Sequence, residues 1–163
     1  MKRNVAFFTG SRADYGLMKP LMEIVKEDKN IIFNMIVTGS HLEKKFGSTW
    51  KQIQKDNFKI SSKFKILTKD DSPKGISQSL SLAVRKTSEV LSSLKPDLLI
   101  ILGDRYEALA AAQAAMIHRI PIAHIHGGES TFGLIDEAIR HSISKMSHLH
   151  FVSCQKYKKR LIQ

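Results

Sequence analysis

Cysteine is nearly absent from this 163-residue sequence, and its single cysteine, Cys154, has no second thiol with which to form a disulfide. A disulfide-stapled secreted scaffold is therefore excluded, and we expect a protein of the reducing cytoplasm. Long apolar runs are also missing, because no stretch approaches the roughly 20 residues that cross a bilayer, so no membrane partner is expected. The apolar content, 42% of the residues, is ordinary for a globular protein.

Acidic residues are scarce: 15 Asp and Glu face 26 Lys and Arg, which gives a formal net charge of +11. Nucleic acid, a compact anionic ligand such as a nucleotide diphosphate, or a lysine-rich solvated surface would each account for this charge. The lysines are scattered along the chain rather than gathered in one block with interleaved aromatic residues. Nucleic acid is therefore not expected as a partner, and the other two explanations stay open.

Short apolar runs alternate with helical patterns along the chain. Strands are expected over residues 4–9, 31–38, 58–67, 98–102, 121–125 and 148–153. Helices are expected over residues 17–25, 42–57 (with Gly47 as a point of interruption), 76–94, 106–118, 135–147 and 155–162, with a loop over 68–75. This alternation predicts one α/β domain over residues 1–163, with a parallel sheet between two layers of helices.

Four polar turns follow the expected strands, over residues 10–16, 39–41, 103–107 and 126–129. Right-handed crossovers between parallel strands place every such turn at the same edge of the sheet. Ligands of open α/β sheets bind at that edge, so we expect the functional site there.

The first two turns contain candidates for substrate binding. Gly10 lets the backbone approach a ligand, and Arg12 offers a guanidinium for a phosphate or a carboxylate. The turn is neither a Walker A loop nor a G-x-G-x-x-G fingerprint, and a structural ion pair of Arg12 is the alternative. His41 is the candidate from the second turn.

The third turn places a carboxylate beside a guanidinium directly after an apolar run. Asp104 either caps the helix expected from residue 106 or faces the sheet edge as a base or orienting group. Arg105 would neutralise a phosphate. Both readings of Asp104 agree with its position in the sequence.

Two histidines, His124 and His126, alternate at the end of a strand, so their imidazoles should point to the same side. Zinc would need further ligands, and no cysteine is nearby, so we expect no metal site. His124 is either a substrate contact or a structural histidine bonded inside the core. His126, next to two glycines, should be exposed at the edge, where it could exchange protons near neutral pH.

Five segments in this order resemble the UDP-N-acetylglucosamine 2-epimerase family: GSRADYG, VTGSHL, LGDRYEALA, IAHIHGGE and DEAIRHSISKMSHLHF. The resemblance is closest to the hydrolysing branch and spans essentially the whole sequence. Members have two Rossmann-like domains arranged as in GT-B glycosyltransferases, with the active site in the cleft between them. The resemblance implies that residues 1–163 are the N-terminal domain, without the C-terminal UDP-binding domain and with little activity alone.

The resemblance also implies a reaction. UDP-N-acetylglucosamine and water give N-acetylmannosamine and UDP through a 2-acetamidoglucal, for bacterial sialic acid synthesis and so for capsule or surface polysaccharide. No cofactor is implied, the partner is the UDP-sugar, and the full-length protein is expected to be a homo-oligomer. A hydrolysing epimerase of a UDP-linked diacetamido-trideoxy sugar, for legionaminic acid, is the alternative, as is a non-catalytic sugar-nucleotide binding module.

Residue roles follow from the matching motifs. Asp104 and Asp136 match acidic positions of the family, the latter four residues before Arg140 in the helix motif. Much of the family has glutamate where this sequence has His126, so either His126 or Glu129 would take that acid or base role. The positions implied in substrate binding are Gly10, Arg12, His41, Arg105, His124 and Arg140.

Overall fold

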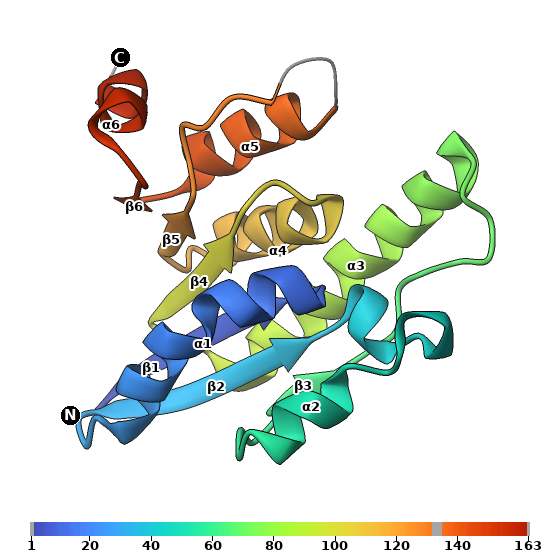
Figure 1. Ribbon diagram of the computed structural model, residues 1–163, viewed down its shortest axis with the longest axis horizontal. Coiled ribbons are helices and arrows are strands. Elements are labelled where there is room, and N and C mark those ends of the chain that lie inside the picture. The colour runs from blue at the N-terminus through green and yellow to red at the C-terminus, as the bar shows by residue number, and fades with distance from the viewer. Residues whose placement is uncertain (1, 132–134, 163) are drawn as a thin grey trace.

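A single twisted sheet of six parallel strands organises the computed structural model, which describes residues 2–131 and 135–162 (Figure 1). The strands are β1 (Arg3–Thr9), β2 (Ile31–Val37), β3 (Ser62–Lys63), β4 (Leu98–Leu102), β5 (Ile122–Ile125) and β6 (Leu149–Phe151). Their order across the sheet is β3-β2-β1-β4-β5-β6. The predicted Rossmann-like parallel sheet is therefore confirmed.

Helices connect the strands and cover both faces of the sheet. They are α1 (Arg12–Glu27), α2 (Trp50–Lys55), α3 (Pro73–Leu94), α4 (Tyr106–Ile117), α5 (Ile135–Met146) and α6 (Gln155–Ile162), with short 3-10 helices η1 (Gly39–Leu42) and η2 (Lys44–Phe46). Figure 1 shows α1 in front of the sheet, and α3 and α4 packed side by side behind it. None of the helices in the described residues is both long and apolar enough to cross a membrane.

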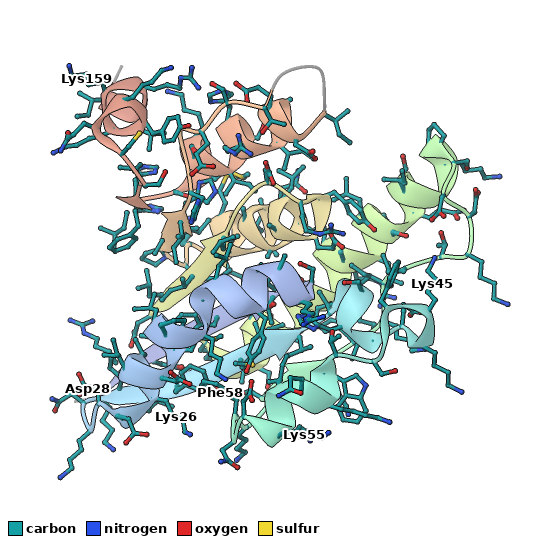
Figure 2. The ribbon with its side chains drawn as sticks, in the orientation of Figure 1. Lys26, Asp28, Lys45, Lys55, Phe58 and Lys159 are labelled. Atoms are coloured by element: carbon teal, nitrogen blue, oxygen red, sulfur yellow. The ribbon has the colours of Figure 1, made fainter. Side chains whose placement is uncertain are left out.

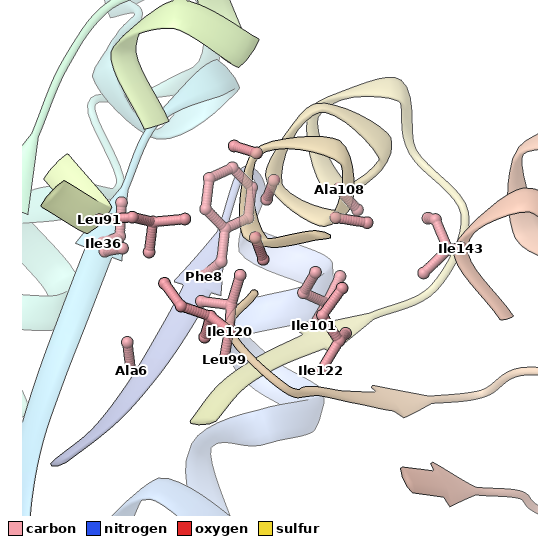
Figure 3. Packing of buried hydrophobic residues seen from close by; sticks show 14 of the residues in the cluster. Ala6, Phe8, Ile36, Leu91, Leu99, Ile101, Ala108, Ile120, Ile122 and Ile143 are labelled. Atoms are coloured by element: carbon pink, nitrogen blue, oxygen red, sulfur yellow. The ribbon is translucent and has the colours of Figure 1, made fainter. Parts of the chain in front are cut away.

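The alternation of side chains along β1 explains the two core layers. Val5 and Phe7 point to the face covered by α1 and α2, whereas Ala6 and Phe8 point to the face covered by α3, α4 and α5. Figure 3 shows the second layer, in which Phe8 lies near Leu91 of α3 and Ala108 of α4. A strand segment buried on both faces needs apolar residues at every position, which is why residues 5–8 of β1 and all of β4 are continuous apolar runs.

The alanine-rich helix α4 is buried against its own sheet rather than left for a partner. Its residues Ala110, Ala111, Ala112 and Ala115 have no exposed surface. Because alanine side chains are short, α4 can approach both the sheet and the neighbouring α3 closely. The close packing fixes the position of the first turn of α4, which lies at the edge of the sheet where the polar turns gather.

Over residues 42–57 a helical stretch with Gly47 as a point of interruption was expected, and no continuous helix forms there. The chain forms η1, η2 and a short α2 instead, because Gly47 and Ser48 have left-handed backbone conformations with φ of 82° and 49°. A left-handed residue interrupts the right-handed hydrogen-bond pattern of a helix. Because of this break, the segment after β2 is irregular where it lies beside the edge of the sheet.

The expected strand over residues 58–67 was also wrong in length. Only Ser62 and Lys63 pair with β2. Phe58 is buried in the layer under α1, whereas Ile66 is buried against α3 and α4. The chain crosses from one face of the sheet to the other around this edge, so most of the segment cannot continue a ladder.

The ends of β1 and β2 approach each other closely at Gly39, which has a φ of 60°. A Cβ at this position would lie 2.5 Å from the carbonyl oxygen of Gly10 and 3.0 Å from Oε1 of Glu107. Glycine is therefore required both by the backbone conformation and by the space.

We predict that Gly39→Ala lowers the free energy of unfolding by about 2–4 kcal/mol, because left-handed strain and overpacking add. Urea unfolding measures this difference. The control is Gly16→Ala, at an exposed position of α1 where a Cβ meets no heavy atom within 4 Å. The control should stabilise the protein by about 0.5–1 kcal/mol, and equal stabilities of the two variants would contradict the prediction.

Candidate functional site

The turn after β1 is built around the buried carboxylate of Asp14. Its oxygens accept hydrogen bonds from the backbone N–H groups of Gly10, Ser11 and Tyr15, at 2.8, 2.8 and 3.0 Å, and from the Ser11 hydroxyl at 2.7 Å. Ser11 in turn caps α1 by accepting from the N–H of Asp14. This network fixes the backbone around Arg12, which is exposed and forms no ion pair with any of the described residues.

A cavity of about 610 Å³ lies between the turns after β1, β2 and β4 and the loop before α3. Its walls include Arg12, Arg105, Ser40, Phe46 and Tyr106. The lining carries three cationic side chains, those of Arg12, Arg105 and Lys45, against the two carboxylates of Asp70 and Asp71, so one positive charge remains in excess for an anionic ligand. The structure therefore brings together the two arginines that the sequence placed in separate turns.

Arg105 is attached to the first turn of α4 by a bidentate ion pair. Its Nε and Nη2 atoms donate to the two carboxylate oxygens of Glu107 at 3.1 and 2.8 Å. Glu107 is 1% exposed, whereas the Arg105 side chain is 48% exposed. Arg105 is thus bonded to a buried carboxylate, while the exposed part of its side chain lines the open cavity.

On the other side of the same turn, Asp104 forms an ion pair with Arg140 of α5. The Nη2 atom of Arg140 donates both to Asp104 Oδ2 and to the hydroxyl of Thr131, the latter at 2.9 Å. Burial lowers the pKa of the Arg140 guanidinium, which is only 7% exposed. The pair holds the Asp104 carboxylate in one orientation at the sheet edge.

The alternative that Asp104 caps α4 is wrong. Arg105 occupies the N-cap position, and no side chain caps this helix end. The Asp104 carboxylate points to Arg140, which is 36 residues away in the sequence. A partner so distant is supplied only by the packing of α5.

His124 is completely buried and supports the turn that contains Asp104. Its Nε2 lies 2.7 Å from the carbonyl oxygen of Gly103, and its Nδ1 lies 3.2 Å from the Ser144 hydroxyl. A carbonyl only accepts, so the ring proton is on Nε2 and Nδ1 accepts from Ser144. Burial lowers the pKa of His124 to about 4. Both nitrogens are occupied, so His124 positions the turn and does not itself reach a ligand.

His126 lies just beyond β5 and has a left-handed backbone with φ of 65°. This conformation ends the strand alternation, and His126 therefore bonds to different partners from His124. Its Nδ1 is 2.7 Å from Oε1 of Glu129, which also accepts from the Ser153 hydroxyl at 2.9 Å. With Nδ1–H donating to Glu129, the Nε2 of a neutral ring is left as the basic nitrogen.

The acidic start of α5 has two carboxylates with different surroundings. Glu137 accepts from the Thr131 N–H at 2.7 Å and pairs with His141 at 3.1 Å, and these contacts lower the pKa of Glu137. Glu137 and His141 can pair because they lie four residues apart on one face of α5. Asp136 is half-buried and lies one turn before Arg140, on the same side of the helix.

His41 lies inside the domain rather than in the cavity. It is fully buried, with Nε2 2.9 Å from the Thr9 hydroxyl and Nδ1 2.7 Å from the Thr49 hydroxyl. Burial lowers the pKa of His41, although the charge of Asp14 acts in the opposite direction. Its bonds connect the end of β1 with the segment before α2.

The lysines that carry most of the positive charge do not form one cluster at this site. Figure 2 shows Lys26, Lys55, Lys45 and Lys159 at separate places on the outside of the molecule. Lys26 also lies 5.2 Å from the ring centroid of Phe58. Among the described residues, no group of three or more His, Cys, Asp or Glu side chains has an arrangement suited to a metal ion.

Comparison with known proteins places this site in a family. The sequence model of the UDP-N-acetylglucosamine 2-epimerase family matches residues 23–163. The chain belongs to this family. Its site residues can therefore be compared with the motifs of 2-epimerases.

Two curated relatives match nearly the full length of the chain. A Campylobacter jejuni protein named GDP/UDP-N,N'-diacetylbacillosamine 2-epimerase (hydrolyzing) is 46% identical, over 99% of this chain and 42% of that protein. The Escherichia coli polysialic acid biosynthesis protein P7 is 41% identical, over 99% of this chain and 41% of that protein. The chain therefore spans less than half the length of these two relatives.

Solved 2-epimerase structures share the fold. The UDP-GlcNAc 2-epimerase of Neisseria meningitidis, solved with UDP-GlcNAc bound, superposes with a TM-score of 0.83 at 24% identity. The match covers 99% of this chain and 42% of that structure. At this level of identity the likeness concerns the arrangement of strands and helices.

Sequence reasoning missed several residues that build this site. Asp14 organises the first turn, Glu107 holds Arg105, and Thr131 contacts both Arg140 and Glu137. For Asp14 a signal was present, since Ser11-x-x-Asp14 has the spacing of a capping box. Glu107 and Thr131 carried no comparable local signal, because their partners come from other elements.

The buried His124 predicts a pH dependence of stability. In the unfolded chain the pKa of a histidine is about 6.5, whereas in the fold the pKa of His124 is lowered to about 4. The unfolded state therefore binds the proton first, and stability contributed by the neutral ring is lost as the pH falls from 6.5 to 4.

We predict that the difference in unfolding free energy between the wild type and His124→Gln shrinks over this pH range, by on the order of 3 kcal/mol. Urea unfolding of both proteins at several pH values measures it. His41 and the carboxylates are present in both proteins, so their contributions cancel. Parallel pH profiles of the two proteins would contradict the prediction.

Proposed function

We propose that this chain is the N-terminal domain of a hydrolysing 2-epimerase that acts on a UDP-linked 2-acetamido sugar. The observation that carries the proposal is the pairing of Asp104 with Arg140 beside the His126–Glu129 pair, at the ends of two neighbouring strands. Asp104 is followed directly by Arg105, which lines the cavity together with Arg12. The complete protein, in this proposal, is a cytoplasmic enzyme of two domains that forms a homo-oligomer.

The proposed reaction has two stages. In the first, the bond between C1 and the diphosphate breaks, its electrons leave with UDP, and a base removes the proton from C2, giving a 2-acetamidoglucal. In the second, water adds its oxygen to C1, and an acid returns a proton to C2 on the opposite face. N-acetylmannosamine or its analogue and free UDP are the products, and no cofactor is needed.

The residues meet the demands of these stages. Asp104, held by Arg140, and Asp136 on the same side of α5 as Arg140 are the proposed acid and base groups. His126 takes the place of the glutamate found in much of the family, with Glu129 accepting from Nδ1 so that Nε2 can exchange a proton.

The leaving group requires positive charge. Arg12 and Arg105 line the cavity and would stabilise the negative charge that develops on the diphosphate. Arg12 follows the backbone turn at Gly10, which Asp14 organises, and lines the same cavity as Arg105.

Two substrates are supported to different degrees. UDP-N-acetylglucosamine is the substrate implied by the family motifs and by the likeness to a polysialic acid biosynthesis protein, at 41% identity. The 46% identity to a diacetylbacillosamine 2-epimerase favours a UDP-linked diacetamido-trideoxy sugar. Both sugars undergo the same chemistry at C1 and C2, so the site described above accommodates either reaction.

The decisive experiment uses the two-domain protein that contains this chain. We expect one of the two UDP-sugars to give free UDP and a product inverted at C2, with deuterium at C2 when the reaction runs in heavy water. NMR of the product follows both. Failure to release UDP from either sugar would exclude the hydrolysing epimerase and leave a binding module.

In the same protein, we predict that Asp104→Asn lowers kcat by roughly 10²–10⁴-fold, the usual contribution of a positioned acid or base. Steady-state assays and urea unfolding should be run together, so that lost activity is not confused with unfolding. Asp28→Asn is the control, because Asp28 is exposed at the far end of α1 (Figure 2). Wild-type turnover by Asp104→Asn would remove Asp104 from the chemistry.

A further inference from the structure

We propose that Glu107 is a positioning residue that holds the Arg105 guanidinium in the orientation in which it binds the diphosphate of the substrate. The inference rests on the proposed function and concerns how its anion site is built. Two parallel hydrogen bonds, 3.1 Å from Nε and 2.8 Å from Nη2, join Arg105 to the two carboxylate oxygens of Glu107.

The carboxylate of Glu107 is itself held in a closed compartment. The side chain is 1% exposed and lies beneath the turns that follow β1 and β2. A Cβ on Gly10 would lie 3.4 Å from Cβ of Glu107, and one on Gly39 would lie 3.0 Å from its Oε1. Glycine at these two positions leaves room for Glu107, and the surrounding backbone leaves its carboxylate little freedom to move.

The geometry leaves part of the guanidinium available to a ligand. Arginine has five N–H donors, and Glu107 accepts two of them, from Nε and from Nη2. The three remaining N–H groups belong to a side chain that is 48% exposed and lines the cavity of about 610 Å³. Arg12 shares the cavity but has no ion pair in the described residues to hold it.

A fixed arginine binds an anion with a smaller loss of side-chain entropy than a free one. Burial acts to lower the pKa of Arg105, but the hydrogen bonds and charge of Glu107, together with the charges of Asp14 and Tyr106, raise the pKa overall. The guanidinium therefore stays charged beside the cavity. The opposing effect is that the charge of Glu107 weakens the attraction of Arg105 for the diphosphate.

Positioning of Arg105 and weakening of its attraction for the diphosphate predict opposite changes in KM when the charge of Glu107 is removed. In the two-domain protein, Glu107→Gln keeps the shape but replaces one acceptor oxygen by an NH₂ group, which cannot accept from Arg105. Positioning predicts that KM for the UDP-sugar rises about tenfold, equivalent to the loss of one hydrogen bond of a charged group, and that kcat falls as well, because the same guanidinium stabilises the charge that develops on the leaving diphosphate. An unchanged or lowered KM would overturn the inference.

A double-mutant cycle tests whether Glu107 acts through Arg105. In the Arg105→Met background, Glu107→Gln should produce no further increase in KM, because the group that it positions is gone. Equal increases in both backgrounds would mean that Glu107 affects binding by another route and would overturn the inference. Glu89→Gln is the matched control, since Glu89 pairs with Arg85 and Lys86 on the exposed side of α3, and its KM should equal that of the wild type.

The proposed function and this inference can fail separately. If the wild-type protein releases no UDP from any sugar, the epimerase proposal fails, and the affinity for UDP is then measured by calorimetry. A weaker affinity of Glu107→Gln, with no change for Glu89→Gln, supports the positioning role. Equal affinities of wild type and Glu107→Gln overturn it.

Discussion

Parallel pairing of β1, β2, β4 and β5 is the constraint on which the whole site depends. Because all these strands run in one direction, the turns that follow them meet at one edge of the sheet. The hydrogen bond from the Gly103 N–H to the Ile125 carbonyl, 3.0 Å long, extends the β4–β5 pairing into the turns themselves. Asp104 and His126 therefore lie in the turns that follow two neighbouring strands.

Two ion pairs orient adjacent side chains of the turn after β4 in different directions. Asp104 pairs with Arg140 of α5, whereas Arg105 pairs with Glu107 of α4. Taking a charge out of water is unfavourable unless an opposite charge and hydrogen bonds compensate it, so each pair has a strong preference for one geometry. Adjacent residues of one turn thus point to different regions: one to the proposed proton-transfer groups, the other to the anion-binding cavity.

The elements that were predicted correctly have clear local patterns, such as the apolar run of β4 and the helical patterns of α4 and α5. Over residues 42–57 the sequence indicated an interruption at Gly47, but not that left-handed Gly47 and Ser48 would leave only 3-10 turns and the short α2. At the site, Arg12 and Arg105 lie in one cavity as expected, but His124 is a buried support. Burial of an imidazole depends on helices that pack over it, which a strand pattern does not reveal.

The sequence by itself determined the alternation of strands and helices, the edge at which the polar turns gather, and the family to which the chain belongs. These properties follow from local periodicity and from motifs of consecutive residues. Only the tertiary structure decided which carboxylate meets which arginine. Arg140 lies 3.7 Å from Glu137 of its own helix, but its shorter contact is with Asp104, 36 residues earlier, because the packing of α5 against the sheet brings the two together.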